Sequence, residues 1–155
     1  SAGRRGGVWP TCRLRSRAQP RTVKSPPLPH KTFAGEVLPP GGKVVVFSQI
    51  RECSSIIESW VRHYAALGFF KLLLYLDDPE DISGRVLEEG GWVEAGFVEL
   101  TKVDARVKAS WPEMPSWGRI GRHCEMEVQS RQILNNEHAL LRARELDADW
   151  MLHVD

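Results

Sequence analysis

Two runs of apolar residues constrain the fold of this 155-residue chain more than any other feature. Residues 43–49 read KVVVFSQ and residues 71–78 read KLLLYLDD. Neither run alternates polar with apolar residues, as a half-exposed strand would. Continuous β-branched, leucine-rich and aromatic runs are typical of strands buried on both faces, as in a parallel sheet.

The segments around these runs have other patterns. Residues 54–68 place apolar side chains at helical spacing, with Ser54 or Ser55 expected to cap the helix, Glu58 in a capping box and Gly68 at its end. Further along we expect a short helix over 81–91, one or two strands over 92–103, a long loop over 104–122, a long helix over 123–146 and a final buried strand over 149–155. The long helix is expected to bury a stripe of six residues: Met126, Ile133, Leu134, Leu140, Leu141 and Leu146.

Strands that alternate with helices predict an α/β domain with a mainly parallel sheet. Ligands of open α/β sheets bind beyond the carboxyl ends of the strands, so the residues that follow each strand are the first candidates for chemistry. Neither a GxGxxG nor a GxxxxGK[ST] motif is present. Instead, acids end two strands, at Asp77-Asp78 and at Asp155. Carboxylates there suit sugar hydroxyls, a base edge or a hard divalent cation, although Asp77 and Asp78 equally suit a helix cap or a turn.

The net charge of +1 conceals two different segments. Residues 1–42 hold eight Lys or Arg against one acid, whereas residues 43–155 hold 13 basic and 19 acidic residues. Residues 1–42 are also rich in Pro and Gly, so we expect a disordered basic tail or linker before a domain over 43–155. A solvated linker is the favoured interpretation. The alternatives are contact with nucleic acid or anionic lipid, or the remnant of an Arg-rich targeting sequence.

No apolar run reaches the roughly 20 residues that cross a bilayer, so no membrane span is expected. Three cysteines without CxxC spacing favour isolated thiols over a disulfide framework or a zinc site. Three tryptophans, Trp92, Trp111 and Trp117, are able to stack on a sugar, but anchoring of core or loop is their commoner use.

Two blocks of sequence resemble GT-A glycosyltransferases, with family-2-like and family-92-type enzymes as the nearest comparison. They are ESWVRHYAALGFFKLLLYLDD, residues 58–78, and RQILNNEHALLRARELDADWMLHVD, residues 131–155. Both blocks occur in the order and spacing of that family, and the resemblance covers residues 43–155. It implies a partial GT-A, Rossmann-like domain that binds a nucleotide sugar.

The resemblance also implies roles for individual residues. Asp77 or Asp78 is expected to contact the base or ribose, and Asp155 to be the first acid of a D-x-D motif that holds Mn²⁺ or Mg²⁺ on the donor diphosphate. Gln132 is expected either in the pocket or in a structural hydrogen bond. The full set of expected donor-binding residues is Ser48, Arg51, Glu52, Asp77, Asp78 and Gln132.

The implied activity is transfer of a sugar from a nucleotide donor to an unknown glycan, protein or lipid acceptor, typically with inversion and with a carboxylate as general base. That base is expected beyond Asp155, so this chain is expected to be an N-terminal portion, cut through the D-x-D motif and inactive alone. Two other functions stay open: a non-catalytic module that binds a nucleotide or a partner, and, less favoured, nucleic-acid binding through the basic tail. A place in the secretory pathway and a place in the cytoplasm are equally compatible with the sequence.

Overall fold

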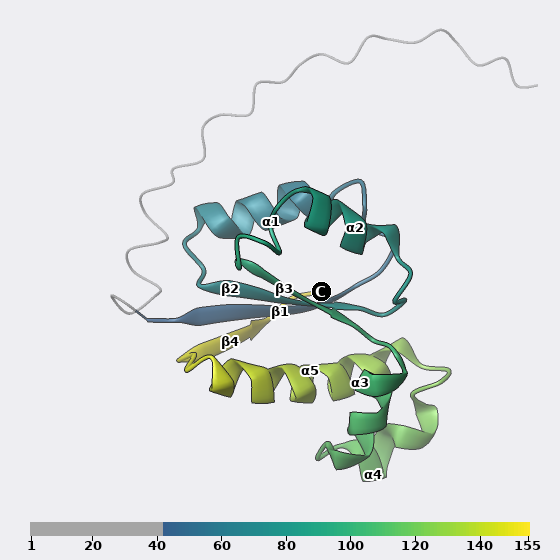
Figure 1. Ribbon diagram of the computed structural model, residues 1–155. Helices are drawn as coiled ribbons and strands as arrows, with labels where there is room; N and C mark the ends of the chain where they lie inside the picture. The colour runs from purple at the N-terminus through teal and green to yellow at the C-terminus, as the bar shows by residue number, and fades with distance from the viewer. Residues whose placement is uncertain (1–41) are drawn as a thin grey trace, which may run out of the picture.

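Four strands form the centre of residues 42–155, which are the residues that the computed structural model describes (Figure 1). They are β1 (Val44–Ile50), β2 (Lys71–Leu76), β3 (Val98–Lys102) and β4 (Trp150–His153). All pairings are parallel, and the order across the sheet is β3-β2-β1-β4. The predicted α/β class with a parallel sheet is therefore confirmed. The tail predicted over residues 1–42 lies outside the described residues, except for its last glycine.

β1 and β2 are buried on both faces, as their unbroken apolar runs predict. In β1, Val45 and Phe47 belong to one apolar cluster, whereas Val46 and Ile50 belong to a second cluster on the opposite face. The sheet therefore separates two hydrophobic layers. The first lies toward the long C-terminal helix, and the second lies toward the two helices described next.

Helices α1 (Ile57–Ala66) and α2 (Ile82–Glu89) cover the second face of the sheet (Figure 1). The predicted serine cap of α1 is wrong, because Ile56 occupies the N-cap position and no side chain caps the helix. The backbone carbonyl of Cys53 accepts bonds from the amides of Ile56 and Ile57 at 3.0 and 2.9 Å, so a backbone turn satisfies those donors. α2 has a side-chain cap, in which Asp81 accepts from the Ser83 amide at 2.8 Å.

Helix α5 (Val128–Glu145) covers the first face and begins five residues later than predicted. Its expected apolar stripe is confirmed only for Leu134, which is buried, and for Leu146, which is partly buried against the first apolar cluster. Met126, just before the helix, is 91% exposed, and Ile133, Leu140 and Leu141 are also exposed. The residues that face the sheet are instead mostly small or polar: Ser130, Leu134, Asn135, Ala139 and Ala143. Small side chains let α5 approach the sheet closely. The face of α5 that is buried is therefore the one with small side chains, and not the most hydrophobic one.

The long loop predicted over residues 104–122 is also wrong. This segment forms four short helices: α3 (Ala105–Ser110), η1 (Trp111–Glu113), α4 (Trp117–Ile120) and η2 (Gly121–His123). Asp104 caps α3 by accepting from the amides of Arg106 and Val107. Glu137 of α5 accepts from the hydroxyl and the amide of Ser116, at 2.6 and 3.1 Å. The segment is therefore anchored to α5, and Figure 1 shows α3 beside the start of that helix and α4 below it.

β4 forms one edge of the sheet and is less buried than predicted. Trp150 is 65% exposed and Leu152 is 44% exposed, because β4 has a neighbouring strand on one side only. His153 points to the opposite side from these two residues, as predicted, and its ring packs 5.1 Å from that of Phe47. Within residues 42–155, no helix combines the length and apolar character that a bilayer crossing requires.

A half-buried histidine between α5 and β2 leads to a prediction about pH. His138 Nδ1 lies 2.7 Å from the Tyr75 hydroxyl, and burial lowers the pKa of His138 while nearby Glu145 opposes this effect. The unfolded chain then binds a proton at this imidazole more readily than the folded chain does. We expect the free energy of unfolding to fall as the pH drops below about 6.5, and His138→Gln to show a smaller fall in denaturant titrations between about pH 7.5 and 5.5. Equal slopes for both proteins would contradict this role.

Candidate functional site

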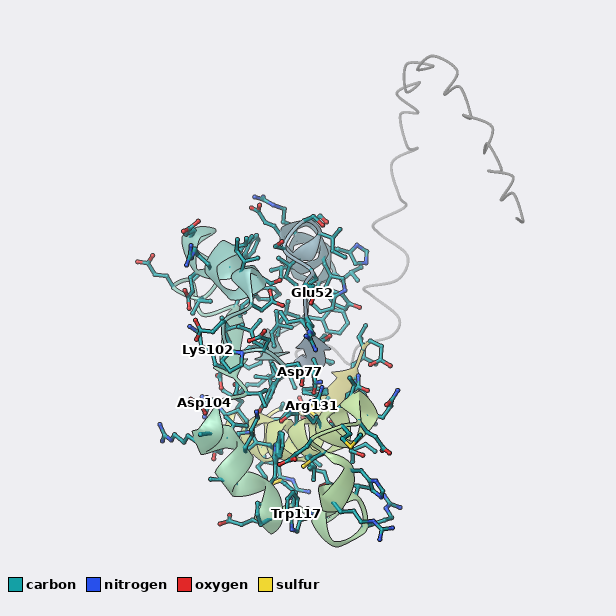
Figure 2. The ribbon with its side chains drawn as sticks, turned by 90° about the vertical axis from the view of Figure 1, so that its right-hand side faces the viewer. Glu52, Asp77, Lys102, Asp104, Trp117 and Arg131 are labelled. Atoms are coloured by element: carbon teal, nitrogen blue, oxygen red, sulfur yellow. The ribbon has the colours of Figure 1, made fainter. Side chains whose placement is uncertain are left out.

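A cleft of about 650 Å³ opens at the carboxyl ends of the parallel strands. Its lining comes from the loops after β1 and β2, from the α3–α4 segment and from the start of α5. Figure 2 looks onto this edge of the sheet and shows Asp77 and Arg131 at its centre, with Glu52 above them and Trp117 below. The residues on which the site depends are Arg51, Asp77, Asp78, Trp111, Trp117 and Arg131.

Asp77 and Arg131 form a two-bond ion pair at the base of this cleft. Arg131 Nε donates to one carboxylate oxygen and Nη2 to the other, both at 2.7 Å, and the Asp77 side chain is only 4% exposed. The hydrogen bonds and charge of Asp77 raise the pKa of Arg131 above its ordinary value. Gln49 Nε2 adds a third bond to Asp77 at 3.1 Å. The Asp77 carboxylate is therefore largely occupied by the protein itself.

A chain of side-chain hydrogen bonds extends from this ion pair into the protein. Trp111 Nε1 donates to Asn135 Oδ1 at 3.0 Å, and Asn135 Nδ2 donates to Gln49 Oε1 at 2.8 Å. An indole N–H only donates and an ionised carboxylate only accepts, so Trp111 and Asp77 fix the orientation of both amides between them. Asn135 is fully buried. The chain ties one wall of the cleft to the sheet edge and to α5.

Two further cations line the cleft. Arg51 Nη1 is 3.9 Å from Asp77, its Nε is 3.5 Å from Glu52, and its side chain is 55% exposed. Lys108 of α3 is exposed and makes no ion pair with any residue in the part of the chain that the structure describes. Because Arg131 already has a carboxylate partner, Arg51 and Lys108 are the cations available to a ligand.

Asp78 is the more accessible of the two acids that end β2. It is exposed, it lines the cleft, and its Oδ1 accepts from the backbone amide of Glu80 at 3.0 Å, as in a turn. The sequence left Asp77 and Asp78 as equal candidates for ligand contact. Their surroundings separate them, since Asp77 has three donors from the protein and Asp78 has one.

The two tryptophans of the cleft are held differently. Trp111 is buried and its N–H is fixed by Asn135. Trp117 is half-buried and lies against Gly121: a Cβ placed on Gly121 would fall 2.5 to 2.8 Å from three atoms of the indole ring. The close approach of ring to backbone requires the glycine and fixes the tilt of the indole.

The remaining residues predicted for the donor site do not line the cleft. Ser48 is buried in β1, on the same face as Val46 and Ile50. Glu52 has an exposed side chain and a positive φ of 52°, and its amide donates to Asp81. Sequence reasoning thus placed Arg51, Asp77 and Asp78 at the cleft, and gave no site role to Arg131 and Lys108.

Gln132 and Asp155 contact each other, and neither residue lines the cleft. Gln132 Nε2 donates to Asp155 Oδ1, and the same oxygen is 3.3 Å from His153 Nε2. In the described residues no group of three or more His, Cys, Asp or Glu side chains could hold a metal ion. Asp155 alone fits a divalent cation only as one ligand of a site that substrate phosphates complete, an arrangement that Mg²⁺ often adopts.

Strand order sets the sequence of these features along the sheet edge. β2 is followed by Asp77 and Asp78, β1 by Arg51, and β4 by Val154 and Asp155. Because β1 lies between β2 and β4, Arg51 is positioned between the acids that follow β2 and the carboxylate that follows β4. A ligand that extends from the cleft along this edge therefore passes Arg51, which lines the cleft, before it reaches the end of β4 and Asp155.

Comparison with known proteins gives no match: no family model fits the chain, and no curated protein and no solved structure is significantly similar to it.

Proposed function

We propose that the cleft binds the nucleotide part of a nucleotide-sugar donor, and that the domain belongs to a GT-A glycosyltransferase acting on a glycan, protein or lipid acceptor. One observation carries the proposal. The cleft lies at the carboxyl ends of parallel strands, and its lining includes the available cation Arg51, which follows β1, the strand next to the β4 that leads to Asp155. Ligands of open α/β sheets bind at this edge, and the cleft volume is in the range of small-molecule sites.

The proposed arrangement matches the chemistry of such a donor in three parts. The base and ribose occupy the cleft, where the Asp78 carboxylate accepts from a base N–H or a ribose hydroxyl. The diphosphate lies beside Arg51, whose guanidinium forms charge-assisted bonds to phosphate oxygens. The sugar then lies toward Asp155. Asp77 serves a different purpose, which is to hold Arg131 and the floor of the cleft in place.

A divalent cation enters the proposal through the substrate. Mn²⁺ or Mg²⁺ would take Asp155 and oxygens of the diphosphate as ligands, and would offset charge on the departing diphosphate. The residues of the chain bind and orient the donor. We assign no catalytic base among the described residues.

A binding panel on the 155-residue chain tests the proposal. Trp111 and Trp117 line the cleft, so a bound nucleotide should change tryptophan fluorescence, and calorimetry gives the affinity. The panel contains UDP, GDP, ADP and CMP, with sugar conjugates of those that bind. We expect at least one nucleoside diphosphate to bind more tightly than its nucleoside and than pyrophosphate, because base and diphosphate are contacted together. Failure of every nucleotide to bind would refute the proposal.

The second candidate is a non-catalytic module that binds a nucleotide or a partner. It is favoured by the Asp77 carboxylate, which is occupied by hydrogen bonds from Arg131 and Gln49 and serves to hold the cleft together. The two candidates differ in whether a divalent cation takes part in binding. Because no catalytic base is assigned among the described residues, turnover by this chain does not separate the two candidates. An affinity for a nucleoside diphosphate that Mn²⁺ raises supports the enzyme, whereas nucleotide binding that Mn²⁺ leaves unchanged supports the module.

Metal titration gives a prediction specific to Asp155. One carboxylate is a poor cation site, so Mn²⁺ alone should bind weakly, and a nucleoside diphosphate should raise the affinity for Mn²⁺ by adding phosphate ligands. Asp155→Asn should remove most of that increase and leave nucleotide affinity without metal unchanged. Electron paramagnetic resonance spectra of Mn²⁺, recorded with and without nucleotide, measure both effects. Tight Mn²⁺ binding without nucleotide would contradict the prediction.

A further inference from the structure

Trp117 lines the cleft, and the protein holds its indole ring in a fixed position. The indole is half-buried, packs against the apolar cluster under α5, and lies against the backbone of Gly121. It also lines the cleft together with Trp111. Since the backbone supports the ring, a ligand ring that stacks on the indole costs little further ordering of the side chain.

The polar groups that share the lining with Trp117 suit the edge of a base. Lys108 supplies a donor, Glu125 supplies an acceptor, and both are exposed. A base edge presents one or two donors and acceptors, whereas a pyranose ring presents a hydroxyl on most of its carbons and needs more partners. The position along the sheet edge agrees, because Asp155, the carboxylate proposed to lie near the sugar, does not line this cleft.

We propose that Trp117, seated on Gly121, is the surface on which the nucleobase of the ligand stacks, and that the α3–α4 segment thereby positions the base in the cleft. The inference rests on the proposed function and goes beyond it by naming the residue that binds the base. Stacking of a base on an aromatic side chain tolerates every base, because each has a π face. Discrimination between bases then comes from Lys108 and Glu125 at the base edge.

Two glycines of the same short segment provide a matched pair of variants. Gly121→Ala places a methyl group against the indole and must displace it, whereas a Cβ at Gly118 meets no atom within 4 Å. Gly118→Ala should therefore bind nucleotides as the wild type does. Gly121→Ala and Trp117→Leu should lower the affinity for the nucleoside diphosphate that binds best by about tenfold or more, and Trp117→Phe by less, because a phenyl ring keeps part of the stacking surface.

Three probes separate the parts of the ligand: the nucleoside diphosphate, its nucleoside and pyrophosphate. The inference requires that Trp117→Leu and Gly121→Ala lower the affinities for the nucleoside diphosphate and for the nucleoside, and leave the affinity for pyrophosphate unchanged. Circular dichroism and the melting temperature confirm that each variant is folded. Undiminished nucleoside diphosphate binding by folded Trp117→Leu or Gly121→Ala would refute it. Losses confined to the sugar conjugate would also refute it, because the indole would then contact the sugar. If the wild type binds no nucleotide, the proposed function fails together with this inference.

Discussion

Replacing Asp77 by asparagine is expected to destabilise the protein by about 3 kcal/mol or more, as measured by urea unfolding. The substitution removes the charge that pairs with Arg131, whose side chain is only 14% exposed. The asparagine amide would also place an N–H₂ group against the N–H donors of Arg131 and Gln49. Arg131 would then keep one partner of moderate strength, the Cys124 carbonyl at 3.1 Å. Removing one partner of a buried ion pair destabilises the protein by more than the intact pair stabilises it, because the remaining charge is left buried without a partner.

Asp78→Asn is the matched control, since the same change occurs one residue away on an exposed side chain. It should alter the free energy of unfolding by less than about 0.5 kcal/mol, while lowering nucleotide affinity. The double variant Asp77→Leu with Arg131→Met should recover part of the stability that Asp77→Asn loses, because both charges are removed together. If the two asparagine variants prove equally stable, Asp77 does not have the structural role that its three hydrogen bonds indicate.

Replacing Arg51 by alanine is expected to lower the affinity for a nucleoside diphosphate by about tenfold to a hundredfold, the equivalent of one charge-assisted hydrogen-bonding group. Stability should hardly change, because the side chain is 55% exposed and its nearest carboxylate contacts are 3.5 and 3.9 Å away. Binding of the nucleoside without phosphates should be unaffected. Calorimetry with UDP or GDP and the corresponding nucleoside measures the difference.

Arg62→Ala provides the control for the loss of one positive charge. Arg62 is an exposed residue of α1, pairs with Glu58 at 2.6 Å and does not line the cleft. Its removal should leave nucleotide affinity unchanged and should only slightly alter the dependence of binding on salt. Equal losses in both variants would assign the effect to the general field of the protein, and Arg51 would lose its proposed contact with phosphate.

The strands of the fold were predictable where burial and sequence pattern agree. β1 and β2 are covered on both faces, so every position of these strands favours an apolar residue. The prediction of a strand therefore does not depend on which residues face which side of the sheet. Prediction failed where tertiary contacts compete with local pattern. In α5, Leu140 and Leu141 fit an apolar stripe, yet Ala139 and Ala143 face the sheet, because closeness of approach decides the orientation of the helix.

The α3–α4 segment shows the same limit at the site. Its prolines and glycines resemble those of a loop, but Asp104 caps a helix there and Glu137 holds Ser116 from a distant part of the chain. Lys108 and Trp117 owe their place in the cleft to this anchoring. No local feature of the sequence marks the approach of Trp117 to Gly121.

The sequence by itself determined the class of fold and the alternation of strands with helices. It also determined that Arg51, Asp77, Asp78 and Asp155 follow three of the strands. These features were predictable because a strand's propensity and its burial pattern depend on residues close together in the sequence. Only the tertiary structure decided what each of these residues does. Asp77 meets Arg131 across 54 positions of the chain and is thereby occupied, whereas Asp78 beside it faces the cleft. The two acids are chemically identical, and the difference arises because the bend after β2 places Asp77 against Arg131 of α5, whereas Asp78 stays exposed.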